Sequence, residues 1–134
     1  MSEFLPTTSE YFPRNPKIGD SGYIIAEISM KNVLNSLGAV SVAEMSFTAG
    51  VKLFARMLSK SVTGSKGNPY VFAALTITSV ATTAVQYIFD EQLEALDKLF
   101  IRIYYEYQMV DYTQQGLTVQ IPRWVAVRTK CYLG

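Results

Sequence analysis

Residues 101–109, IRIYYEYQM, set the organisation of this chain, because they alternate with the two-residue period of a β-strand. The odd-numbered positions carry Ile, Tyr and Met, whereas the even-numbered positions carry Arg, Tyr, Glu and Gln. The alternation resumes after the turn sequence TQQG at residues 113–116 and continues to Leu133. The two runs predict a C-terminal two-stranded antiparallel β-hairpin over residues 101–133.

The loop of this hairpin determines which residues face each other. A three-residue loop with Gly116 in the left-handed conformation would place Thr113 opposite Leu117. That register also aligns Met109 with Ile121, so the apolar faces of both strands coincide. A two-residue loop would shift the register by one and pair apolar with polar residues, so we predict the three-residue loop.

Before the hairpin lies an uncharged stretch, YVFAALTITSVATTAVQYIF at residues 70–89, which is long enough to cross a bilayer as a helix. Asn68 and Pro69 are typical first residues of a helix, and we predict a helix over residues 69–99; two helices with a break at Phe89–Asp90 fit equally well. Threonines and small residues favour close packing on protein, although insertion into lipid stays open as an alternative. The small residues that would make this contact are Ala73, Ala81 and Ala84.

Two shorter helices are predicted upstream. Residues 23–28 form a short extended or helix-entry run, after which Ser29 can cap a helix over residues 29–37. Ser41 and Glu44 have the spacing of a capping box, which predicts a second helix over residues 42–60. Its apolar face, including Phe47 and Phe54, would pack on the uncharged stretch and complete a hydrophobic helical hairpin.

Residues 1–22 are predicted to form an extended, proline-rich N-terminal arm, because three prolines exclude a helix. Its apolar residues follow neither the helix period nor the strand period. We therefore expect a neighbouring subunit to hold the arm, with residues 23–134 forming a single α+β domain. The N-terminus lacks a basic segment followed by an apolar run, so no signal peptide is expected and the localisation stays open.

The composition favours association with protein. The chain is 49% hydrophobic and 17% charged, whereas about 25% charge is usual. A surface short of charge tends to associate, and the nine tyrosines suit interfaces. Basic residues on the hairpin lie among aromatics on which bases could stack, but a net charge of +1 makes nucleic acid an unlikely partner. These residues are Arg102, Arg123, Arg128 and Lys130.

The residues available for catalysis are few. Histidine is absent from the sequence, which removes the commonest general base and metal ligand. Cys131 is the single cysteine and is interpreted as a small buried hydrophobe. GSKGN at residues 64–68 lacks the spacing of a phosphate-binding loop. The acidic residues between Asp90 and Asp97 are interpreted as a solvated helix face. We therefore predict no catalytic, cofactor-binding or metal-binding residues, and no enzyme.

The sequence thus predicts an α+β structural subunit of a homo-oligomer, of the virion or filament type. A small membrane-active or membrane-anchored protein that inserts its helical hairpin is the alternative, and a soluble binding domain is the third hypothesis. The predicted interface residues are Phe4, Leu5, Tyr11, Phe12, Ala73, Ala81, Ala84 and Trp124.

Overall fold

A computed structural model describes residues 4–62, 70–71 and 76–134, and it contains a five-stranded sheet in the order β1-β2-β4-β5-β3. Neighbouring strands are antiparallel except β3, which runs parallel to β5. The strands are β1 (Thr7–Tyr11), β2 (Ser21–Ser29), β3 (Tyr70–Val71), β4 (Lys98–Gln114) and β5 (Leu117–Leu133).

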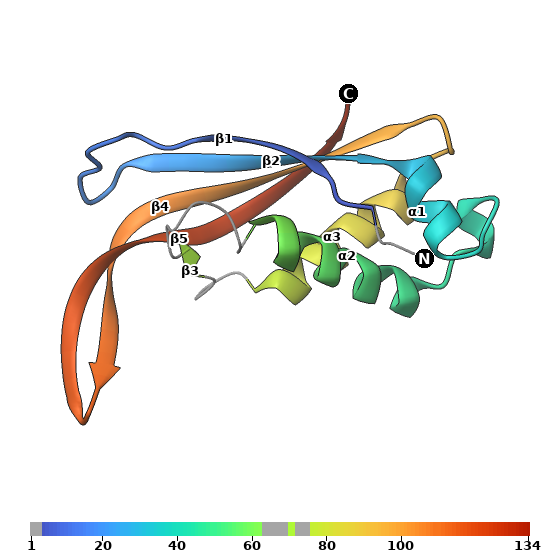
Figure 1. The fold of residues 1–134 in the computed structure, drawn as a ribbon. Helices are drawn as coiled ribbons and strands as arrows, with labels where there is room; N and C mark the ends of the chain where they lie inside the picture. The colour runs from blue at the N-terminus through green and yellow to red at the C-terminus, as the bar shows by residue number, and fades with distance from the viewer. Residues whose placement is uncertain (1–3, 63–69, 72–75) are drawn as a thin grey trace.

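The helices gather on one face of the sheet, and the other face is left open (Figure 1). Helices α2 and α3 pack against each other and bury their apolar sides, including Phe54 and Val85, against the sheet. The helices are α1 (Met30–Ser36), α2 (Phe47–Val62) and α3 (Ile77–Asp90), and a short 3-10 turn, η1, covers Val42–Glu44.

The core depends on the pairing of β2 with β4. Ile24 lies opposite Ile103, and Ala26 lies opposite Ile101. All four side chains are at most 2% exposed and point toward the helices. Two strands with the same alternation therefore create one continuous apolar face, which α2 and α3 cover.

The predicted fold class, an extended N-terminal arm with a hydrophobic helical hairpin and a C-terminal two-stranded β-hairpin, is wrong, because the strands form one sheet. Residues 7–11 form β1 at the edge of the sheet, where Tyr11 lies opposite Tyr23 of β2. The hairpin is joined to β2 along β4 instead of standing alone. Phe12 packs 5.5 Å from the Tyr105 ring and 4.9 Å from the Trp124 ring, centroid to centroid. The beginning of the chain is therefore held by its own sheet.

The predicted helix over residues 69–99 is also wrong in extent. Helix α3 begins after Thr76, whose hydroxyl accepts from the Ser79 amide while the Ser79 hydroxyl accepts from the Thr76 amide. This capping box starts the helix at Ile77, eight residues after the predicted start at Pro69, a residue that lies outside the described ones. At the other end Gln92 has a φ of 49°, which is incompatible with a continuing α-helix, and β4 begins at Lys98.

The predicted hairpin register is wrong as well. Gln114 lies opposite Leu117, so the loop has two residues, Gln115 and Gly116. Their φ angles of 54° and 81° are both positive, as a tight hairpin turn with the twist of the strands requires. In the part of the hairpin next to β2 the apolar faces still match, because a β-bulge shifts the register between Tyr104 and Tyr105.

The bulge inserts one extra residue of β5. Tyr104 pairs with Arg128 and Tyr105 pairs with Ala126, so Val127 has no partner on β4. On the body side of the bulge Cys131 lies opposite Ile101, facing the helices. Beyond the bulge, the even-numbered residues of β5 take over that side of the sheet.

We expect Phe54→Ala to lower the free energy of unfolding by ~3–5 kcal/mol, because the fully buried ring would leave a cavity. Phe47→Ala on the same helix is the matched control, since Phe47 is 38% exposed and should cost at most about 1 kcal/mol. Chemical denaturation followed by circular dichroism measures both. Equal losses would contradict the packing of α2 beneath the sheet.

Gly22→Ala tests whether β1 belongs to this sheet. A methyl group at Gly22 would collide with the Phe12 ring and lie 2.8 Å from the Tyr11 carbonyl oxygen. We expect a loss of ~1–3 kcal/mol in unfolding free energy from this overpacking. Phe12→Ala removes the main collision, so the double variant should lose less than the sum of the two single losses. Additive losses would show that Phe12 does not pack over Gly22.

Candidate functional site

The open face of the sheet carries an unusual concentration of aromatic and cationic side chains. They come from alternate positions of four strands, opposite to the residues that form the core. In the sheet, Tyr11, Tyr23, Tyr104 and Arg128 form one cross-strand row, and Arg102 and Lys130 are opposite each other in the next. We call this set the open-face cluster; its members are Tyr11, Tyr23, Phe100, Arg102, Tyr104, Arg128, Lys130 and Tyr132.

Arg102 occupies the middle of the open-face cluster and is held by aromatic rings. Its guanidinium carbon lies 4.7 Å from the centroid of the Tyr23 ring and 5.8 Å from those of Tyr104 and Tyr132. The guanidinium also donates a long hydrogen bond of 3.5 Å to the Tyr104 hydroxyl. The guanidinium carbon of Arg128 lies over the same Tyr104 ring, 4.1 Å from its centroid. These distances are typical of cation–π interactions.

The charge of the open-face cluster is not balanced by carboxylates. Among the described residues, no Asp or Glu forms an ion pair with Arg102, Arg128 or Lys130. The positive charge of the cluster affects Tyr104: the hydrogen bond from Arg102, and after it the nearby positive charges, lower the pKa of the phenol. The hydrogen bond to Tyr104 likewise raises the pKa of Arg102, so the guanidinium keeps its charge. The open-face cluster is thus a positively charged surface with rings between its charges.

The second exposed surface is the far end of the β4–β5 hairpin, residues 109–122, which we call the distal hairpin. It extends past the end of β2, whose pairing with β4 stops at Glu106, and it bends away from the sheet (Figure 1). Within the described part of the chain, these residues pair only with each other. The distal hairpin therefore depends on two strands alone, an arrangement that is marginally stable in water.

The two faces of the distal hairpin differ sharply in polarity. On one face Val110 lies opposite Ile121, and Tyr112 lies opposite Val119, followed by Leu117 at the turn. Tyr112, Val119 and Leu117 are 46%, 53% and 72% exposed. We call these five residues the apolar hairpin face.

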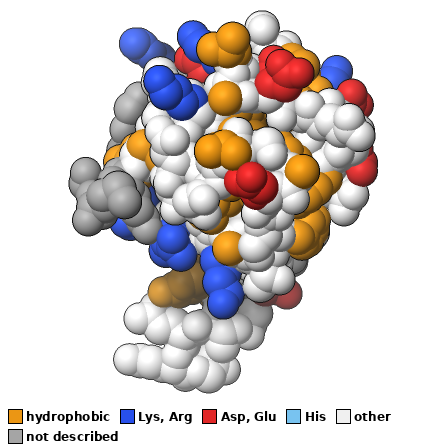
Figure 2. Space-filling view, turned by 90° about the vertical axis from the view of Figure 1, so that its right-hand side faces the viewer, with side chains coloured by type: hydrophobic (Ala, Val, Ile, Leu, Met, Phe, Trp, Pro, Cys, Tyr) orange, Lys and Arg blue, Asp and Glu red, His pale blue; other side chains and the backbone are white. Residues whose placement is uncertain are grey.

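The other face of the distal hairpin carries Met109 opposite Pro122 at its base, and toward the turn it is polar, with side chains that bond to each other. The Thr113 and Thr118 hydroxyls are 3.0 Å apart, and the Gln120 amide donates to the Asp111 carboxylate at 3.4 Å. The sequence has no charged residue between Tyr112 and Pro122. In Figure 2 the projecting end extends below the body, and its tip shows neither blue nor red side chains.

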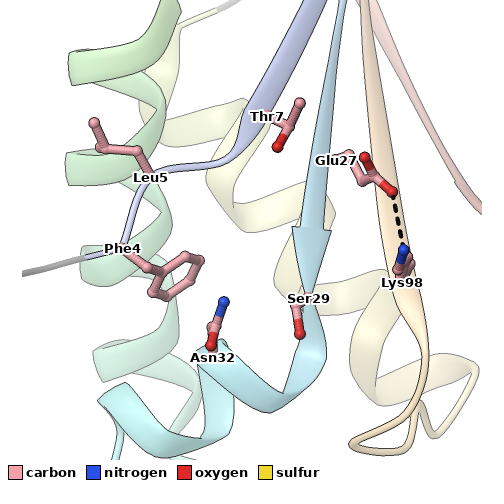
Figure 3. A pocket seen from close by; sticks show the side chains of 7 residues that line it. All are labelled: Phe4, Leu5, Thr7, Glu27, Ser29, Asn32 and Lys98. Carbon is pink, nitrogen blue, oxygen red and sulfur yellow. Dashed lines mark ion pairs between the residues drawn. The ribbon is translucent and has the colours of Figure 1, made fainter.

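A small hollow lies between the start of β1, the end of β2 and α1 (Figure 3). Its volume is about 210 Å³, whereas ligand pockets are usually ~300–1,000 Å³. The only carboxylate in its lining, Glu27, forms an ion pair with Lys98 at 3.6 Å. The hollow therefore offers no free acid or base, and it does not resemble a catalytic site. Its lining consists of Phe4, Leu5, Thr7, Glu27, Ser29, Asn32 and Lys98.

The predicted interface residues fall into three groups. Leu5 and Tyr11 are 56% and 55% exposed, so both remain accessible to a partner. Phe4 and Phe12 are half-buried, Trp124 is 6% exposed, and Ala81 and Ala84 are fully buried inside the chain. Trp124, Ala81 and Ala84 pack in the core of this chain, and Phe4 and Phe12 pack against that core. Ala73 lies outside the described residues.

The sequence identified part of the open-face cluster but not the apolar hairpin face as an exposed surface. It noted the cations of the hairpin and the aromatic residues beside them, and it named Tyr11 as an interface residue, but it did not show that β1 and β2 bring Tyr11 and Tyr23 to the same face. It placed Leu117 and Val119 on the apolar face of the hairpin. Both residues lie in the distal hairpin, none of whose residues is buried. The only feature of the sequence that sets this region apart is the lack of charge around the turn.

The structure shows few features of metal or membrane chemistry. In residues 4–62, 70–71 and 76–134, no group of three or more Cys, Asp or Glu side chains is placed to hold a metal ion. None of the helices in these ranges has the length and apolar character to cross a bilayer. The GSKGN loop at residues 64–68 falls outside them.

Comparison with family models, curated proteins and solved structures found no match.

Cys131 provides a chemical test of the sheet, because burial raises the pKa of its thiol to about 11. Only the thiolate reacts, so labelling by iodoacetamide at pH 8 should be about a hundredfold slower than for an ordinary thiol with a pKa near 8.5. The rate should increase as the pH rises toward 11, because more of the thiol is then ionised. Labelling in denaturant, measured by mass spectrometry, is the control. Equal rates in native and denatured protein would place Cys131 at the surface.

Proposed function

We propose that this protein is a non-enzymatic structural subunit that assembles with copies of itself, of the virion or filament type. The observation that carries the proposal is the apolar hairpin face, which projects into solvent on a two-stranded ribbon. Large exposed apolar surfaces are rare on monomers and mark contacts with other molecules. The low charge of the whole chain supports the same conclusion, because little of its surface opposes association.

The edges of the distal hairpin also support assembly. Protein edge strands usually carry charges or prolines that prevent further pairing. Here Tyr112 to Ile121 has neither, and Pro122 interrupts only the end of this segment. The neighbouring strand β3 pairs with β5 only at Trp124 and Val125. Both edges of the distal hairpin thus remain available, at least in the part of the chain that is described.

A second copy of the chain is the simplest molecule to cover this face. Two apolar hairpin faces packed together would bury Tyr112, Val119 and Leu117 of each copy and leave the Thr113–Thr118 faces in water. Tyrosine is well suited to such a contact, since its ring is apolar and its hydroxyl can still reach solvent. Contacts of this kind, repeated by the same surface of every subunit, follow the symmetry rule for homo-oligomers.

The double variant Tyr112→Ser/Val119→Ser removes a cross-strand pair from the apolar hairpin face. We expect it to raise the concentration at which oligomers form by at least about tenfold, which corresponds to ~1.4 kcal/mol. Sedimentation velocity over a range of protein concentrations measures the effect. The reason is that the variant lacks two apolar side chains that association would bury, so it loses that part of the association free energy.

The matched control is Thr113→Ala/Thr118→Ala, which changes the cross-strand pair next to it on the polar face. It should leave the concentration dependence of assembly unchanged. A wild-type protein that stays monomeric at all concentrations would disprove the proposal, as would equal effects of the two double variants.

A further inference from the structure

We propose that the open-face cluster binds single-stranded nucleic acid. This surface lies on the body of the sheet, away from the distal hairpin, and the proposal does not depend on self-assembly. The ligand would lie across β4 and β5, with phosphates near the cations and bases against the rings.

The first argument is charge. Arg102, Arg128 and Lys130 lie on neighbouring strands, with Arg102 directly opposite Lys130. No described carboxylate forms an ion pair with them, although two acidic residues flank the cluster on this face: Glu27, which is paired with Lys98, and Glu106, in the row next to Tyr104 and Arg128. The three charges are therefore available to an anionic ligand. Phosphates along a nucleic acid strand supply several charges at once and release counterions on binding.

The second argument is the position of the rings relative to these charges. Along β4 the order on this face is Phe100, Arg102 and Tyr104, so the cation lies between two rings. Phe100 stacks on Tyr132 at 5.3 Å with an interplanar angle of 10°, and Tyr11 lies 5.8 Å from Tyr23. Aromatic rings and guanidinium planes are the groups on which unpaired bases stack. A simple polyanion would need only the charges.

The third argument is that Arg102 is positioned without an acidic partner. A half-buried guanidinium is normally paired with a carboxylate, which neutralises it. Here Tyr23, Tyr104 and Tyr132 surround it instead, and its Nε–H is buried with no hydrogen-bond partner among the described atoms. The rings fix the side chain but leave its charge uncancelled. This arrangement suits a group that must meet a phosphate.

The net charge of +1 made nucleic acid an unlikely partner at the level of the sequence. The fold separates the charges in space, however. The acidic residues between Asp90 and Asp97 lie in the end of α3 and the connection to β4, while the charged members of the open-face cluster are all cations. The local charge is therefore the relevant quantity for binding.

Fluorescence anisotropy with a labelled single-stranded oligothymidylate tests the proposal. We expect binding that weakens with salt, with a slope of log K against log salt near −2, since each phosphate contact contributes about −0.7. Arg128→Gln/Lys130→Gln should reduce the slope by about 1.4 and the affinity by at least about tenfold. Tyr104→Leu keeps every charge but removes a ring, and it should weaken binding by roughly fivefold to a hundredfold.

The charge-matched control is Lys31→Gln/Lys52→Gln, which removes two exposed lysines from α1 and α2. It should leave affinity nearly unchanged, and thermal unfolding checks that every variant is folded. The proposal fails if the oligonucleotide does not bind or if this control weakens binding as much as Arg128→Gln/Lys130→Gln. It also fails if poly-glutamate binds equally well and Tyr104→Leu has no effect, which would indicate an acidic protein partner. Loss of self-association in Arg128→Gln/Lys130→Gln, without loss of oligonucleotide binding, would assign the surface to a second copy.

Discussion

The antiparallel pairing of β2 with β4 is the contact on which the rest of this structure depends. It aligns Ile24 with Ile103 and Ala26 with Ile101, so two alternating strands produce one apolar face and one polar face. The apolar face requires a cover, which α2 and α3 supply. None of the helices in the described residues covers the polar face, and it is there that the rings of β1 and β2 meet the cations of β4 and β5. The core and the open-face cluster thus lie on the two opposite faces of the same paired strands.

Local signals predicted part of this fold, and non-local pairing explains the rest. The alternation in residues 101–109 identified a strand, and the apolar face that includes Phe54 identified a helix. Both patterns are local, because they repeat over a short stretch of the sequence. Residues 23–28 were left between strand and helix, since nothing near them shows that their partner lies more than seventy residues away. The long helix prediction failed because its start was taken from Asn68 and Pro69, whereas the cap that starts α3 is formed by Thr76 and Ser79.

The candidate surfaces were harder to predict than the core. Burial leaves a periodic pattern in the sequence, whereas the open-face cluster exists only after four strands have been placed side by side. The cations and most of the rings were visible on the hairpin, but Tyr23 became part of their surroundings only through its pairing with Tyr104. Total charge also concealed the cluster, because it sums residues that the fold keeps apart.

The bulge at Val127 has a further consequence for how this chain can change. The odd-numbered positions of β5 are apolar except Arg123 and Thr129, yet Cys131 faces the helices while Val119 faces solvent. One extra residue thus lets a single pattern serve an interior and an exterior. Because Val127 has no partner on β4, deleting it would remove the bulge and leave every other pair of β4 and β5 in place. A strand shortened at this one position would therefore keep both its buried face and its exposed face.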